Sequence, residues 1–184
     1  MNKLILPLIF FLSVLKMGMG QIPGQIITKQ GQVSFFSHTS VEAIEATNNQ
    51  VLSIVDFSSK EVAVSMLMRA FVFKKALMQE HFNESYIESD IFPKCSFEGK
   101  IIDYEEPAPE VQTKLIKGTI TMHGVSKELD IKTKIENGTD GMAFTGTFNL
   151  EVADFKIKIP PIVAGNISKT IEVNFRFEYQ PYEN

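Results

Sequence analysis

Residues 128–136 read ELDIKTKIE, and this stretch decides the fold class. Apolar residues, among them Leu129 and Ile131, alternate with charged residues, so an extended segment has one apolar face and one charged face. The same alternation recurs in residues 142–151 and 171–179. Alternation with a period of two predicts β-strands that bury one face. The chain is therefore expected to be an all-β protein.

Six further strands are expected on the amino-terminal side of these three. They lie at about 31–38, 42–47, 50–57, 60–73, 95–104 and 112–122. Turn-forming dipeptides such as Asn48-Asn49 and Asn137-Gly138 are expected to join consecutive strands. Eight or nine antiparallel strands with one apolar face either stack as a sandwich or close into a barrel, and closure removes the exposed sheet edges.

The strand expected at 60–73 precedes the one helical segment. Its inward face is predicted to carry six apolar residues, Val62, Val64, Met66, Met68, Ala70 and Val72. Phe71 and Phe73 belong to the opposite face and are expected to lie under the helix. The helix is predicted from Lys74 to about Ser89, where apolar residues recur at helical spacing, and Pro93 prevents its continuation. A single short helix is expected to cover one mouth or side of a barrel.

The first twenty residues are expected to be a secretory signal peptide. Lys3 precedes an apolar run from Leu4 to Leu15, and small residues lie before the expected cut. This run is too short to cross a bilayer core of about 30 Å as a helix. The expected mature chain, residues 21–184, has the length of one domain and is expected to be exported without a stable membrane anchor.

Composition argues against several kinds of partner and cofactor. The chain has 18 basic and 22 acidic residues, and this acidic balance is not typical of a nucleic-acid-binding protein. Cys95 is the only cysteine, so no internal disulfide is expected, and its apolar neighbours predict a buried, inert thiol. His81 and Glu84 have helical spacing but lack further ligands, so no metal site is expected. The sequence has no Gly-x-Ser-x-Gly elbow and no Gly-rich phosphate loop, so no catalytic group or cofactor is expected.

Three stretches of the chain resemble the YceI-like family. They are FVFKKALMQEHFNE at 71–84, KGTITMHGVSK at 117–127 and ADFKIKIP at 153–160. The resemblance implies a lipocalin-like, closed antiparallel barrel of about eight strands in residues 21–184, located in the bacterial periplasm. It also implies that the protein is not an enzyme, and that a polyisoprenoid or a related lipid such as an isoprenoid quinone lies inside the barrel.

The candidate lipid-binding residues are the apolar residues on the inward faces of the strands. They are Val62, Val64, Met66, Met68, Phe97, Ile131, Phe144, Phe148, Phe175 and Phe177. The periodicity alone fits equally a filled core, in which case the protein would be a structural or stress-related interaction protein. A hydrolase or isomerase of an apolar substrate is a third, less favoured reading. The sequence leaves the oligomeric state open, a homodimer included.

Overall fold

Strand β7 (Val125–Gly138) shows the alternation that the sequence predicts. Ile131 and Ile135 are buried, whereas Lys132 and Lys134 between and beside them are exposed. The computed structural model describes residues 21–105, 110–138 and 141–183. In this part of the chain every long strand has one face toward the interior and one toward solvent, as the prediction requires.

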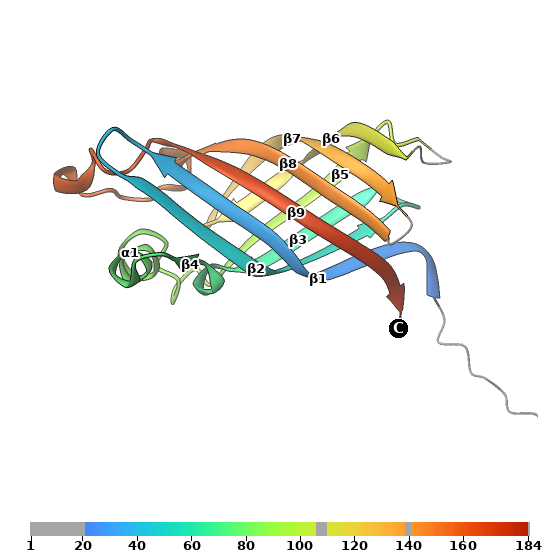
Figure 1. Ribbon diagram of the computed structural model, residues 1–184, viewed down its shortest axis with the longest axis horizontal. Helices are drawn as coiled ribbons and strands as arrows, with labels where there is room; N and C mark the ends of the chain where they lie inside the picture. Colours follow the sequence, from blue (N-terminus) through green and yellow to red (C-terminus); the bar gives the residue numbers. More distant parts are fainter. Residues whose placement is uncertain (1–20, 106–109, 139–140, 184) are drawn as a thin grey trace, which may run out of the picture.

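Eight long strands close into a barrel, which confirms the predicted fold class (Figure 1). Besides β7 they are β1 (Gln21–His38), β2 (Ala43–Asp56), β3 (Glu61–Leu67), β5 (Lys94–Ile102), β6 (Val111–Met122), β8 (Gly141–Glu151) and β9 (Thr170–Glu183). Each pairs antiparallel with the next in the chain, apart from the short strand β4 (Val72–Phe73), which pairs with β2. Pairing of β1 with both β2 and β9 completes the circle.

The two ends of the barrel differ. The helical elements gather at one end, which is at the left in Figure 1. They are η1 (Met68–Ala70), α1 (Ala76–His81), η2 (Phe82–Tyr86), η3 (Val152–Phe155) and η4 (Pro161–Val163). Toward the other end the interior is packed with apolar side chains, and the rings of Phe57 and Tyr104 stack with centroids 4.9 Å apart. The barrel is therefore filled toward one end, and its helical end carries the elements that border an opening.

The predicted turn at Asn48-Asn49 is wrong, because β2 runs through it. Asn48 is fully buried: its amide nitrogen donates to the carbonyl oxygen of Leu67 at 3.0 Å, and its side-chain oxygen accepts from the backbone nitrogen of Gln50 at 2.8 Å. Pairing with β1 is irregular here, since Val33 pairs with Asn48 but Gly31 with Val51. The dipeptide therefore forms a bulge in one long strand and not a hairpin turn.

The predicted strand at 60–73 is also shorter than expected. β3 ends at Leu67, and η1 changes which side of the chain faces inward. As a result Val72, predicted to face inward, is 64% exposed, whereas Phe71 and Phe73 are buried. The predicted helix at 74–89 forms as the short α1 followed by the π-helical turn η2.

Phe71 and Phe73 lie under the helical segment, as predicted. The Phe82 ring on η2 lies 5.8 Å from Phe71 and 5.0 Å from Phe73 between centroids, and it stacks on Phe35 of β1 at 5.6 Å. Aromatic contacts of this kind add to the free energy gained from burial alone. Phe82 is thus the side chain that anchors the helical segment to the barrel.

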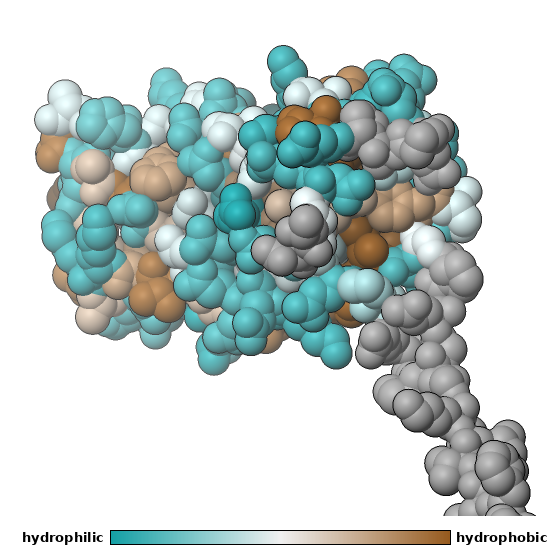
Figure 2. All heavy atoms as spheres, turned by 45° about the vertical axis from the view of Figure 1, so that its right-hand side comes forward, coloured by the Kyte–Doolittle hydropathy of each residue, from teal (hydrophilic) through white to brown (hydrophobic). Residues whose placement is uncertain are grey.

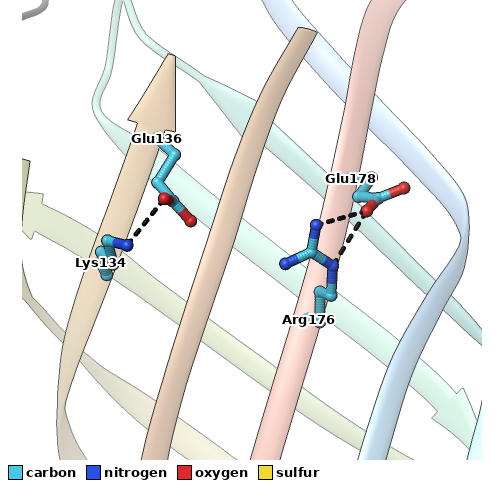
Figure 3. Close-up of polar contacts among 4 residues, drawn as sticks. All are labelled: Lys134, Glu136, Arg176 and Glu178. Carbon is cyan, nitrogen blue, oxygen red and sulfur yellow. Dashed lines mark hydrogen bonds and ion pairs between the residues drawn. The ribbon is translucent and has the colours of Figure 1, made fainter. Parts of the chain in front are cut away.

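The outer face of the barrel is polar. Figure 2 shows hydrophilic residues over most of the visible face. On β7, Lys134 contacts Glu136 at 2.7 Å, and on β9 Arg176 contacts Glu178 at 2.7 Å (Figure 3). Such exposed pairs contribute only about 0–1 kcal/mol each, so their main effect is to keep this face hydrated. In the described part of the chain, no helix has the length and apolar content that a membrane crossing requires.

Candidate functional site

A cavity of about 510 Å³ extends from the helical end into the barrel. Side chains from all eight long strands line it. Its volume is within the range of about 300–1,000 Å³ that small-molecule sites occupy. Eight-stranded barrels are either filled by side chains or hold one small ligand, and this barrel has space for a ligand.

All ten residues predicted from the sequence lie on the cavity wall. They are Val62, Val64 and Met66 on β3, Met68 on η1, Phe97 on β5, Ile131 on β7, Phe144 and Phe148 on β8, and Phe175 and Phe177 on β9. Met68 reaches the wall from η1 and not from the predicted strand. Their contact with a lipid remains a prediction.

The ten predicted residues include none from β1, β2, β6, α1 or the segment 155–159, all of which contribute to the wall. Val33 and Phe35 of β1 line the cavity, although the alternation in residues 31–38 had indicated a strand there. The segment 155–159 also lines it, through Phe155, Ile157 and Ile159. These three residues alternate with lysines, so a period-two pattern was present in the sequence and could have identified them.

Two glycines that face each other across β5 and β6 make room for one wall residue. Gly99 pairs with Gly118, and the Phe97 ring lies over both. A Cβ atom on Gly118 would lie 2.3 Å from the carbonyl oxygen of Glu98 and 2.6 Å from the Phe97 ring. No side chain fits at this position. The glycine pair thus fixes where the aromatic ring of Phe97 rests on the wall.

Few polar groups lie deep in the cavity, and they are bonded within the protein. The Tyr179 hydroxyl lies 2.7 Å from Ser53 Oγ, and Thr133 Oγ1 donates to the carbonyl oxygen of Ile131 at 3.4 Å. Burial raises the pKa of Tyr179 above its ordinary value, and the hydrogen bond between Tyr179 and Ser53 opposes this only in part. A ligand in the deep part of the cavity would therefore meet almost only carbon.

Polar lining residues concentrate at the helical end. Lys75, next to α1, forms an ion pair of 2.7 Å with Glu42, which precedes β2, and both residues border the cavity. His81 and Asn166 border it as well. The wall therefore changes from apolar to polar toward the helical end.

Cys95 has the buried, unbonded thiol that the sequence predicts. It is 3% exposed and lies on the cavity wall. Burial raises the pKa of the Cys95 thiol to about 12. The reactive thiolate is therefore scarce at neutral pH, and Cys95 has the properties of a wall residue and not of a nucleophile.

The structure does not bring the remaining candidate residues into a catalytic or metal-binding arrangement. Within the described residues, no three His, Cys, Asp or Glu side chains come close enough to hold a metal ion. His81 is at the mouth, whereas Glu84 is exposed and does not line the cavity. His123 lies outside the cavity, against Glu88 and the backbone of Phe155.

The family model of the YceI-like domain matches residues 13–179. The chain belongs to the YceI-like family. This confirms the resemblance seen in the three sequence stretches. The match spans all eight long barrel strands apart from the end of β9, so the family assignment applies to the whole barrel.

Solved structures share the fold of this YceI-like chain at low sequence identity. A polyisoprenoid binding domain from Saccharophagus degradans has a TM-score of 0.73 at 10% identity, covering 86% of this chain and 99% of that one. BcnA from Burkholderia cenocepacia has a TM-score of 0.66 at 10% identity, covering 79% and 94%. The Campylobacter jejuni YCEI protein has a TM-score of 0.57 at 19% identity, with both chains fully covered. Among curated proteins, none matches this YceI-like chain.

Proposed function

We propose that this protein binds one long apolar lipid inside its barrel. The ligand class is a polyisoprenoid or an isoprenoid quinone, and the protein transports, stores or sequesters it without chemical change. The observation that carries the proposal is the cavity of about 510 Å³, whose deep wall is apolar and which extends from the helical end. The similarity to a polyisoprenoid binding domain supports the choice of lipid class.

The energetics favour a hydrocarbon chain over a polar ligand. Each CH₂ group that leaves water gains about 0.8 kcal/mol, so a chain of several isoprene units could bind tightly with little polar contact. A polar ligand would have to lose its hydration, and the deep hydroxyls of Tyr179 and Thr133 are already bonded to protein groups. Specificity for the tail would then depend on its length and shape. Among the described residues four methionines line the wall, Met66, Met68, Met78 and Met122, and their flexible side chains suit an irregular branched chain.

The expected signal peptide, residues 1–20, lies outside the described residues. We place the protein in the periplasm on the basis of that leader sequence and of the family resemblance. In this compartment a barrel that shields a long lipid tail from water would let the lipid cross an aqueous space. The proposed role as a carrier or a store follows from this location.

The alternative is a filled barrel that acts through its outer surface as a structural or stress-related interaction protein. A filled interior would leave no space beside residues such as Phe148 and Phe175, yet both border the cavity. This observation favours the lipid-binding proposal over the alternative.

Lipid content tests the proposal. The protein is purified from the periplasm of the source organism, without detergent, and analysed by native mass spectrometry before and after organic extraction. We expect an additional mass that extraction releases as an isoprenoid lipid. In a second measurement the extracted protein is titrated with a polyprenol. Protein that is empty as purified and does not take up the polyprenol would refute the proposal.

A further inference from the structure

The segment 155–159 separates two cavities. Phe155, Ile157 and Ile159 line the barrel cavity, whereas Lys156 and Lys158 line a second pocket of about 430 Å³ on the other side. The β6–β7 hairpin divides in the same way, since Met122 lines the barrel cavity and His123 the second pocket. We call this second cavity the outer pocket. A wall one residue thick therefore has an apolar inner side and a polar outer side.

His123 has a fixed orientation in the outer pocket. Its Nδ1 atom lies 2.8 Å from the carbonyl oxygen of Phe155, and because a carbonyl can only accept, Nδ1 carries the proton. Its Nε2 atom lies 3.1 Å from a carboxylate oxygen of Glu88. The Phe92 ring packs against the imidazole with centroids 4.4 Å apart. Nε2 donates to the Glu88 carboxylate only when the imidazole also carries a second proton, and the contact is then an ion pair.

The two lysines of the outer pocket have no ion-pair partner among the described residues, whereas the nearby Lys127 pairs with Asp154 at 3.3 Å. The hydroxyl-bearing side chains of Ser85 and Tyr86 line the same pocket. Ammonium and hydroxyl groups both donate hydrogen bonds to small anions. The lining holds two lysines against one carboxylate, Glu88, so the pocket offers more positive than negative charge to a ligand.

Uncommon backbone conformations surround this pocket. Of five non-glycine residues with positive φ in the described chain, three line it: Glu88 at 49°, His123 at 51° and Lys156 at 57°. The left-handed region is costly for residues with a Cβ atom, and such residues cluster at binding sites more often than elsewhere. The backbone at these three lining positions therefore has an uncommon conformation.

We propose that the outer pocket binds a small oxyanion of the phosphate class, with Lys156 and Lys158 as its charge partners. Tyr86 lines both the outer pocket and the barrel cavity, so the two sites adjoin at this side chain. The oxyanion is either a free ion or the headgroup of the lipid whose tail lies in the barrel. The headgroup form rests on the proposed function, whereas the free-ion form does not.

Three ligands and two double variants test this proposal. The ligands are farnesol, farnesyl phosphate and inorganic phosphate, each titrated against the purified, lipid-free protein. The variant K156Q/K158Q removes both charges of the outer pocket and keeps the side-chain length. The control K29Q/K132Q removes two exposed strand lysines that do not line either cavity. We expect wild-type protein and control to bind farnesyl phosphate at least 10-fold more tightly than farnesol, and K156Q/K158Q to lose this preference while its farnesol affinity stays unchanged.

Each outcome identifies the oxyanion or overturns the proposal. Equal affinity for the two farnesyl compounds, with inorganic phosphate bound by the wild type and not by K156Q/K158Q, assigns the pocket to a free ion. Identical binding of both phosphate compounds by the wild type and K156Q/K158Q overturns the oxyanion site. Failure of farnesol to bind any form of the protein contradicts the lipid proposal instead, and inorganic phosphate then still tests the outer pocket.

Discussion

The hydroxyl oxygens of Ser53 and Tyr179 lie 2.7 Å apart inside the barrel, although the residues are 126 positions apart in the chain. Ser53 Oγ also donates to the carbonyl oxygen of Ala63 at 3.1 Å, so the Tyr179 hydroxyl must donate to Ser53. The bond links β2 to β9, which both pair with β1 but not with each other. It therefore connects a strand near the start of the chain with the last strand, across β1, which closes the barrel.

Removing Ser53 should destabilise the protein more than removing the Tyr179 hydroxyl. Tyr179→Phe loses one hydrogen bond, worth about 1 kcal/mol. Ser53→Ala leaves the buried hydroxyl of Tyr179 without a partner and costs about 1–3 kcal/mol. Urea unfolding of the two variants measures the difference. An equal or smaller loss of stability in Ser53→Ala would show that Tyr179 finds another partner in the cavity.

The Gly99–Gly118 pair should not tolerate a side chain. In Gly118→Ala the new Cβ would collide with the backbone of β5 and with the Phe97 ring, and overpacking of this kind costs about 1–3 kcal/mol. Thermal unfolding should show a clear decrease in Tm. Gly165→Ala is the control, because nothing lies within 4 Å of a Cβ at that position. Equal Tm values for the two variants would contradict the close approach of β5 and β6.

A carboxylate placed on the cavity wall should remove the ligand. In Met68→Glu and Phe148→Glu an unpaired charge would enter an apolar interior, which either prevents lipid binding or unfolds the protein. Leu67→Glu is the matched control, since Leu67 is adjacent to Met68 but 50% exposed. Lipid content by mass spectrometry and Tm by circular dichroism are measured for all three. Wild-type lipid content together with wild-type Tm in either wall variant would refute the role of the wall.

Much of this wall could be predicted from the sequence because alternation is a local property. Residues 128–136 show by themselves which side chains face inward. The bulge at Asn48 could not be predicted, because its amide is bonded to the backbone of Leu67, 19 residues further along. The exposure of Val72 depends on η1, which changes which side of the chain faces inward. No local periodicity in the sequence predicts this change. Whether the interior is hollow depends on how all eight strands pack, and periodicity does not record it.

The stability of the protein should decrease with rising alkaline pH partly because of Cys95. In the folded chain burial raises the pKa of this thiol to about 12, whereas in the unfolded chain it ionises near its ordinary value. The folded state therefore holds the proton more tightly, and this contribution is complete below about pH 9 and is lost as the pH rises toward 12. Tyr179, whose pKa burial also raises, acts in the same direction from about pH 10.

Urea unfolding from pH 8 to pH 11 measures this dependence, with Cys95→Ala for comparison. The variant should lose less stability than the wild type over the same interval, and the slope that remains should come in part from Tyr179. The native thiol should also resist alkylation at pH 8 and react only after unfolding. Rapid alkylation of the folded protein, or parallel pH profiles of the two forms, would show that the thiol is accessible.

Phe82 should control how firmly the helical segment covers the mouth. Its ring contacts Phe35, Phe71 and Phe73. Because the side chain is only part-buried, Phe82→Ala should lower the free energy of unfolding by less than the about 3–5 kcal/mol that truncation of a fully buried Phe costs. Because α1 and η2 together span only residues 76–86, Phe82→Ala should loosen this segment more than the barrel. Hydrogen exchange should accelerate in residues 76–86 while the strands stay protected, and a bound polyprenol should leave faster.

Glu84→Ala, an exposed change in the same turn, should alter neither the exchange rate nor the release rate. Unchanged exchange and release in Phe82→Ala would mean that other contacts hold the segment, and that the ligand does not leave past it.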